Sequence, residues 1–290
     1  MMELLNTIIH GLLLGGLYSL FATGLSLSFG IMRMINMAHG DMIILSSYLA
    51  LAIVIPLGIN PFLTLLLVVP IMAVLGYILQ KLILNKTLGN DILPPLLVTF
   101  GFSIIIQNTL LEIFSADSQG LNAGKIETAS IQLTQNISVG FFPVLVMLIA
   151  VFVIVALEYL FYKTSLGRNF RATSDDHLTA SLMGIDTHKI YSIAMALATA
   201  IMAVAGVLLA IRTNFDPSAG PLNLLYAFEV VIIGGLGSLW GTLLAGMILG
   251  VSQTIGSYID PGWGILSGHI MFLVILMFRP QGLFPKTKDR

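Results

Sequence analysis

Ionisable side chains inside apolar stretches are the strongest candidates for functional residues in this chain. Four carboxylates lie within or beside long apolar runs, namely Asp41, Glu112, Glu158 and Glu229, and His39 stands two positions before the first. A charge in hydrocarbon costs several kcal/mol unless it faces water or a partner, so each is a candidate for moving a solute or a proton. Glu112 and Glu158 lie near the ends of their runs, where we expect them to reach an interface.

Two regions remain as candidates for a pathway. The run "NMAHGD" (36–41) lies where one apolar stretch gives way to the next, and Glu229 precedes the glycine-rich stretch "GGLGSLWG" at 234–241. Transporters place binding sites at broken helices, because free backbone groups there can line a cavity. Structural hydrogen bonding by the same groups is the open alternative. We predict these pathway residues: Asn36, His39, Gly40, Asp41, Glu229, Gly234, Gly235 and Gly237.

Enzymatic chemistry has little support in the sequence. The glycine-rich stretch lacks the Lys-Ser/Thr ending of a phosphate-binding loop, and Trp240 stands where a dinucleotide fingerprint needs its third glycine. The five histidines show no HExxH spacing, no nucleophile elbow is present, and the absence of cysteine excludes thiolate catalysis, disulfides and zinc–thiolate sites. We therefore predict no catalytic residue, no metal site and no cofactor bound by this chain, with an intramembrane hydrolase as the open alternative.

The composition indicates what must position these residues. The chain of 290 residues is 57% hydrophobic and 9% charged, its net charge is −1, and its mean hydropathy is +0.98. A net charge this small gives no basic surface for nucleic acid. Apolar runs of about 20 residues recur, each long enough to cross a bilayer as a helix. The expected fold is all-α, a single polytopic transmembrane domain over 1–290.

We predict eight or nine spans. The long ones are expected near 4–30, 36–56, 62–84, 93–115, 140–162, 190–211, 242–259 and 263–279, with a shorter, glycine-broken segment at 224–240. Two polar stretches, 116–138 and 163–189, separate them. Small-xxx-small spacings at Gly11/Gly15, Gly237/Gly241 and Gly246/Gly250 are typical of close helix packing in membranes.

Basic residues predict the orientation. With these spans, 11 of the 13 lysines and arginines fall on one side, and only Lys125 and Arg212 on the other. The basic side of a membrane protein is cytoplasmic, so we expect 163–189 inside, 116–138 outside, the N-terminus outside and the C-terminus inside. This arrangement requires 224–240 to cross the membrane. The 11 residues are Arg33, Lys81, Lys86, Lys163, Arg168, Arg171, Lys189, Arg279, Lys286, Lys288 and Arg290.

The polar stretch 163–189 is predicted to contain a short helix. Ser174 is a suitable N-cap, Asp175 and Asp176 suit the positive end of a first turn, and Gly184 can supply a left-handed C-cap. Leu178, Leu182 and Met183 would then share one apolar face. That face either rests on the bilayer or on the protein's own spans, or it is a socket for a cytoplasmic partner.

Four sequence blocks carry a family resemblance. "GLSLSFGIMRMINMAHGDMIILSSYLA" (24–50) resembles the opening of permease subunits from branched-chain amino-acid ABC importers. "LGRNFRATSDDHLTASLMGIDTHKI" is similar to the cytoplasmic loop of that family, "AFEVVIIGGLGSLWGTLLAGMILG" to its glycine-rich block, and "FRPQGLF" to its terminus. One departure is that the position after "AHG" is often Glu in the family, whereas it is Asp41 here. The blocks span nearly the whole chain.

The resemblance implies a division of labour. A periplasmic or lipid-anchored binding protein would deliver leucine, isoleucine or valine, and this chain with a second permease, a copy or a paralogue, would form the channel. Two cytoplasmic ATPases would supply ATP and Mg²⁺ chemistry, and the location would be a bacterial or archaeal inner membrane. Relatives for urea, amides or other amino acids share these blocks, and an ion-coupled secondary transporter is the alternative from another class. The predicted ATPase-coupling residues are Arg168, Arg171, Ser174, Asp175, Leu178, Leu182, Met183 and Gly184.

Overall fold

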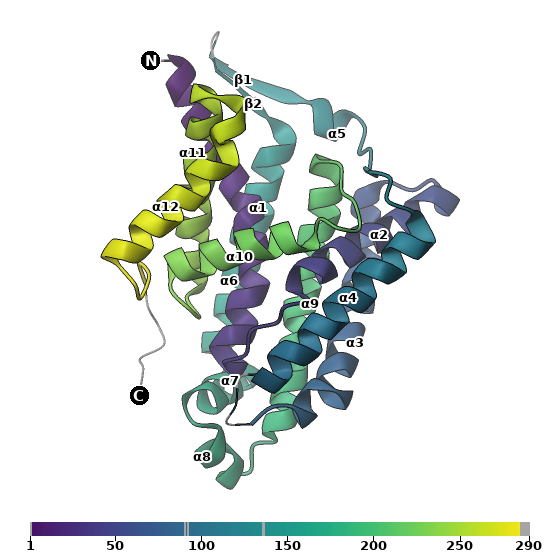
Figure 1. Cartoon of the computed structure of the whole chain (residues 1–290), viewed down its shortest axis with the longest axis vertical. Coiled ribbons are helices and arrows are strands. Elements are labelled where there is room, and N and C mark those ends of the chain that lie inside the picture. Colours follow the sequence, from purple (N-terminus) through teal and green to yellow (C-terminus); the bar gives the residue numbers. More distant parts are fainter. Residues whose placement is uncertain (1, 90, 92, 135–136, 285–290) are drawn as a thin grey trace.

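The chain folds into a bundle of long helices, capped at its two ends by short elements (Figure 1). The computed structural model describes residues 2–89, 91, 93–134 and 137–284. Eight helical segments in that part are long and apolar enough to cross a membrane, as predicted. The long helices are α1 (Met2–Met32), α2 (His39–Leu57), α3 (Pro61–Leu82), α4 (Leu93–Phe114), α6 (Phe141–Lys163), α9 (Thr187–Arg212) and α11 (Leu239–Ile259). The eighth segment has 18 residues and joins the short 3-10 helix η2 (Pro261–Trp263) to α12 (Gly264–Phe278).

The predicted glycine-broken segment is helix α10 (Gly220–Gly234) followed by a turn. At 15 residues it is shorter than a usual span. It follows residues that lead away from the C-terminal end of α9, and Figure 1 shows it lying across the bundle while α1 and α9 run lengthwise. The turn after it reaches Gly30 near the other end of α1. Helix α10 therefore lies across the bundle and is not one of the eight segments long enough to span a membrane, and it begins four residues earlier than expected.

Glycines bring the central helices into contact. A Cβ on Gly11 or Gly15 of α1 would collide with the backbone of α11 at Gly250, Gly246 and their neighbours. The two small-xxx-small spacings therefore face each other, which confirms close packing of α1 on α11. Deep burial of the α1 and α9 side chains around this contact makes these helices the centre of the core.

The polar stretch 116–138 forms structure that the sequence did not predict. After the short helix α5 (Lys125–Thr128) come two antiparallel strands, β1 (Ser130–Thr134) and β2 (Ile137–Gly140), which pair Ser130 with Gly140. Gln119 and Phe215 exchange backbone hydrogen bonds of 2.9 and 2.8 Å, which ties this stretch to the end of α9. The hairpin lies beside the N-terminus, at the top of Figure 1.

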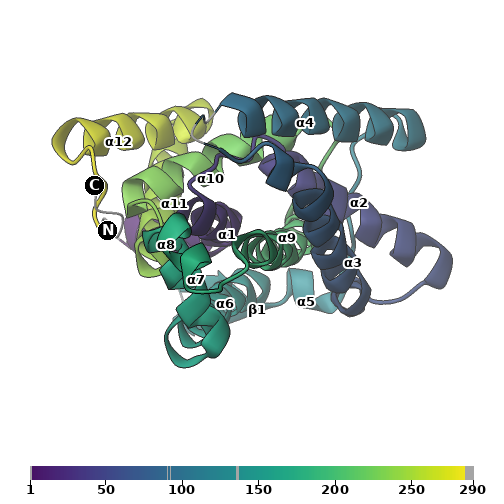
Figure 2. The same cartoon turned by 90° about the horizontal axis from the view of Figure 1, so that it is seen from below.

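The opposite end carries α7 (Ser165–Asp175) and α8 (His177–Leu182), beside the ends of α1, α6 and α9 (Figure 2). The prediction that Ser174 caps a helix was wrong. Thr164 caps α7 earlier, by accepting a hydrogen bond from the Gly167 amide, so Ser174 lies inside that helix. Asp176 is the N-cap of α8, since its side chain accepts from the Leu178 and Thr179 amides at 3.0 and 3.1 Å. Gly184 has φ +85°, so the left-handed end was predicted correctly.

Candidate functional site

The start of α10 meets the start of α2 inside the bundle. A Cβ on Gly40 would overlap the carbonyl oxygen of Gly220, and one on Gly220 would overlap the carboxylate of Asp41. Glycine is required at both positions because no side chain fits between the two backbones. Two helix N-termini, each carrying partial positive charge, therefore converge on one buried carboxylate.

Asp41 is only 2% exposed and is held by a third helix. Its Oδ1 accepts a hydrogen bond of 2.8 Å from the Gln107 amide of α4, which also donates to the Ser103 hydroxyl at 3.3 Å. One turn before Ser103 in α4, the Thr99 hydroxyl accepts from the backbone N–H of Met37 at 3.1 Å. Sequence reasoning missed these α4 residues, although polar residues four apart on an apolar helix were a signal.

Asn36 and His39 shape the turn between α1 and α2. The Asn36 side-chain oxygen accepts from the Ala38 amide at 3.0 Å. The His39 Nε2 lies 2.7 Å from the Phe21 carbonyl oxygen, so this nitrogen carries the proton and donates it. Both side chains are fully buried. In this conformation they hold the backbone that presents Asp41.

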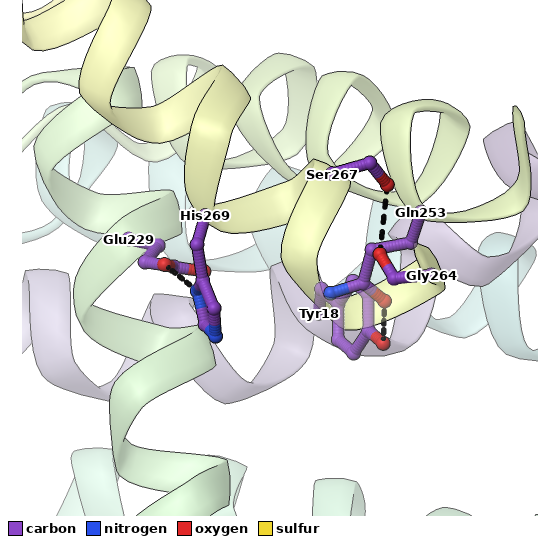
Figure 3. A network of polar contacts seen from close by, with 6 residues as sticks. All are labelled: Tyr18, Glu229, Gln253, Gly264, Ser267 and His269. Atoms are coloured by element: carbon purple, nitrogen blue, oxygen red, sulfur yellow. Dashed lines mark hydrogen bonds and ion pairs between the residues drawn. The ribbon is translucent and has the colours of Figure 1, made fainter. Parts of the chain in front are cut away.

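Glu229 lies further along α10 in a second polar cluster (Figure 3). It is 2% exposed, its Oε1 is paired with Nδ1 of His269 on α12, and its Oε2 is buried with no hydrogen-bond partner among the described residues. Nearby, the Tyr18 hydroxyl of α1 donates to Oε1 of Gln253 on α11 at 2.5 Å, and its ring packs 5.0 Å from that of Tyr226 on α10.

Four elements thus contribute to this cluster, and the sequence singled out Glu229 alone. Tyr18, Gln253 and Tyr226 are isolated in sequence within apolar helices, so no local spacing joined them to Glu229. Their proximity depends on how α1, α10 and α11 pack, which only the structure provides.

The predicted glycines form the turn after α10. A Cβ on Gly234 would collide with the backbone of Gly241, while Gly235 and Gly237 have φ of 94° and 78°, a region that L side chains rarely adopt. The segment after α12 pairs with the free carbonyl groups at the end of α10. The amides of Leu283 and Phe284 donate to the carbonyls of Ile233 and Gly234 at 2.8 and 3.1 Å.

A cavity of about 720 Å³ joins this turn to the predicted coupling residues. Gly237 lines it together with Arg171, Ser174 and Asp175, so the structure brings members of both predicted sets together. The Ser174 hydroxyl donates to the carbonyl of Gly30, which packs against Gly237. Arg33 also lines the cavity, and Arg168 lies outside it on the exposed side of α7.

The Arg171 guanidinium has two partners near this cavity. It donates to the Phe161 carbonyl and lies 5.2 Å from the centre of the Tyr162 ring, a cation–π contact. Both partners are at the end of α6. Arg171 therefore fastens α7 to the span that precedes it.

Helix α8 exposes the predicted apolar face. Leu178, Leu182 and Met183 are 67%, 87% and 79% exposed, whereas Ala180 is buried against the rest of the chain. The Thr179 hydroxyl, together with the Leu178 and Thr179 amides, donates to the Asp176 carboxylate and lowers its pKa below the ordinary value. Asp176 therefore caps α8 as an anion at neutral pH. The three large apolar side chains within 177–183 are therefore exposed enough to contact a partner.

Glu112 and Glu158 lie where interface residues are expected. Glu112 is exposed, and Glu158 is half-buried and accepts a hydrogen bond from the indole nitrogen of Trp240. Neither belongs to the α2–α10 junction or to the Glu229 cluster.

Comparisons with known proteins agree with this architecture. The family model described as "Branched-chain amino acid transport system / permease component" matches residues 7–277. The chain is 27% identical to the high-affinity branched-chain amino acid transport system permease protein BraD of Pseudomonas aeruginosa, and the match covers 98% of this chain and 96% of BraD. It is 26% identical to LivH of Escherichia coli, a permease protein of the same description, with the same coverage of both chains.

One solved structure shows a similar fold. A chain of PsaBC from Streptococcus pneumoniae, solved in complex with Fab, has a TM-score of 0.50 and 15% identity, and the match covers 95% of this chain and 92% of that one. At that identity the likeness concerns the fold alone. The eight apolar helices and the family match from residue 7 to residue 277 lead to one assignment: the chain is a multi-pass membrane protein that belongs to the family of branched-chain amino acid transport system permease components.

Proposed function

We propose that this chain is the membrane-spanning subunit of an ATP-driven importer for leucine, isoleucine and valine. The observation that carries the proposal is the similarity to BraD and LivH over 98% of the chain, because it includes every helix that builds the α10 region. The names of both relatives specify branched-chain amino acids. Urea, amides or other amino acids are the alternative solutes.

The proposed pathway follows α10. The chain leaves the helical conformation at both ends of α10. The helix contacts Asp41 at its start and carries the Glu229–His269 pair in its second half, and a small rotation of α10 would change both contacts. Discontinuous helices suit a solute that needs polar partners within the bilayer, because their free N–H and C=O groups face the break. Alternating access would consist of movement of α10 and its two flanking turns.

A separate ATPase would drive this movement through α7 and α8. The chain itself lacks a phosphate-binding loop, so ATP and Mg²⁺ would be bound by the partner. The apolar face of α8 is the proposed docking element. Contacts from Ser174 to Gly30, and from Gly30 to Gly237, supply a route by which a displaced α7 would shift the turn after α10.

The proposed orientation places α8 in the cytoplasm. Helix α7, which contains Ser174, and strand β1, which begins at Ser130, lie at opposite ends of the bundle in Figure 1, which is compatible with a cytoplasmic loop at 163–189 and a periplasmic loop at 116–138. Three of the basic residues that predicted this orientation, Lys286, Lys288 and Arg290, lie outside the described residues. The other proposed partners are a second permease, a copy or a paralogue, a periplasmic or lipid-anchored binding protein, and membrane lipid.

An ion-coupled secondary transporter is the competing function. The observation that favours it is the pair of the buried Glu229 and the half-buried His269, because a carboxylate beside an imidazole in a membrane can relay protons. Such a transporter would work without an ATPase.

Uptake into proteoliposomes tests the proposal. The chain is reconstituted with a second permease, the ATPase and the binding protein, and labelled leucine, isoleucine, valine, urea and amides are offered with ATP inside. We expect ATP-dependent uptake of the three branched-chain amino acids that persists when ionophores remove ion gradients. Uptake that needs a gradient and no ATP would establish the secondary transporter instead.

A further inference from the structure

Arg212 is a cation without a matching anion at the outer end of the bundle. It is the last residue of α9 and lines a cavity of about 290 Å³ with the loop residues Gly120, Leu121 and Asn122 and with Thr213 and Asn214. Its Nη1 is buried and has no hydrogen-bond partner, and the side chain forms no ion pair, within the part of the chain that the structure describes. Glu127 lines the same cavity, but its carboxylate accepts from the Ala123 amide at 3.3 Å.

An unpaired guanidinium in such a place is costly. Removing a charge from water costs several kcal/mol unless hydrogen bonds or an opposite charge compensate for it. Lysine or arginine at a helix end needs only to reach water, as Lys125 does on the exposed surface of the same loop. Arg212 instead directs one nitrogen into the protein, so the fold maintains an uncompensated positive group there.

The neighbours of Arg212 are also hydrogen-bond donors. Arg212 lies near Tyr18, whose hydroxyl donates to Oε1 of Gln253. The Nε2 of Gln253 is buried and lacks a partner among the described residues. Arg212 and Gln253 therefore each carry a buried N–H donor that has no partner among the described residues. Donors that lack partners favour a ligand that carries acceptor oxygens, such as a carboxylate.

We propose that Arg212 is the outer binding position for the carboxylate of the amino acid that enters this permease. The guanidinium presents donors in a planar fork that matches the two oxygens of a carboxylate, which a lysine ammonium does not. The cavity is close to the lower end of the volumes usual for small-molecule sites, about 300–1,000 Å³. The assignment rests on the proposed function, because it takes an amino acid as the solute.

The test replaces Arg212 in the complete transporter. Uptake of leucine into proteoliposomes is measured against the concentration of loaded binding protein for wild type, Arg212→Gln and Arg212→Lys. We expect the maximal rate of Arg212→Gln to fall about ten-fold or more, the scale of a lost charged hydrogen bond, with the half-saturating concentration of binding protein unchanged. Arg212→Lys should lie in between, because the charge stays and the fork is lost.

Lys125→Gln is the matched control, because it removes the other basic residue of the outer side from an exposed position. It should keep the wild-type maximal rate. If Arg212→Gln raises the half-saturating concentration and leaves the maximal rate unchanged, Arg212 contacts the binding protein and the proposal is overturned. Unchanged kinetics overturn it as well. If Arg212→Gln fails to assemble, Arg212→Lys decides the question: an undiminished maximal rate in that variant also overturns the proposal. Failure of wild type to import any branched-chain amino acid is a different result, and it removes the proposed function together with this inference.

Discussion

Replacing Leu178 and Leu182 together by aspartate is expected to release the ATPase and leave the membrane spans folded. The two side chains are 67% and 87% exposed, so covering them buries roughly one and a half leucine side chains. At about 1.5–3 kcal/mol for each fully buried side chain, docking loses about 2–4.5 kcal/mol, which weakens binding roughly 30-fold to 2,000-fold. The spans keep their packing because neither leucine lies in the buried core.

The assay is titration of the purified permease in detergent with labelled ATPase, with co-purification as a second readout. Ser181→Asp is the matched control, since Ser181 is exposed on the same helix and its replacement adds a charge without removing apolar surface. It should bind the ATPase nearly as tightly as wild type. An unchanged dissociation constant for the double aspartate variant would mean that α8 rests on lipid, and the proposed docking role of this face would be refuted.

Three further predictions concern the junction, the buried acid and the orientation. Gly40→Ala should destabilise the purified protein by about 1–3 kcal/mol, seen as a lower melting temperature, because its methyl group overlaps the Gly220 carbonyl. Glu229→Gln should leave assembly intact but reduce leucine uptake several-fold, because the side chain keeps its size and loses its charge. Since the chain has no native cysteine, single cysteines at Ser174 and Ser130 should react with impermeant maleimide from opposite faces of the membrane.

Each of these has an outcome that would contradict it. Gly101→Ala is the control for the junction, because a Cβ there meets nothing within 4 Å; equal melting temperatures for the two alanine variants would mean that the junction tolerates a side chain. Normal uptake by Glu229→Gln at normal expression would make the acid structural, and His269→Gln should then also be silent. Labelling of both cysteines from outside would contradict the proposed topology, because it would place the two loops on the same face of the membrane.

The sequence was sufficient for the spans because burial in lipid imposes a simple length and composition. It also located α10, since glycines that leave helix ends free are visible without a structure. The predicted N-cap at Ser174 was wrong, because the stretch forms two helices instead of one. Thr164 caps the first helix and Asp176 caps the second. Choosing between good caps depends on where the preceding span ends, which local sequence does not encode.

The candidate site was only half visible in the sequence. Asp41 and Glu229 stood out as acids in apolar runs, but their partners Gln107 and His269 come from helices that are distant in sequence. Neutral polar residues are common in membrane helices, so Gln107 carried no distinguishing signal by itself. The pairing of residues depends on the packing of α4 and α12 against the bundle, which is a property of the tertiary fold.

The hydrogen bonds from Leu283 and Phe284 to the end of α10 have a consequence for biosynthesis. Leu283 follows Ile233 by about 50 positions, so at roughly 5–20 residues per second the ribosome delivers it several seconds after α10 has been made. Until then the last carbonyls of α10 lack these hydrogen-bond partners, and an unpaired backbone group inside a bilayer costs several kcal/mol. The nascent permease should therefore pass through a stage in which α10 is loosely held and open to membrane chaperones or proteases. Newly made chains would acquire protease resistance around α10 only after residues 283–284 had been added.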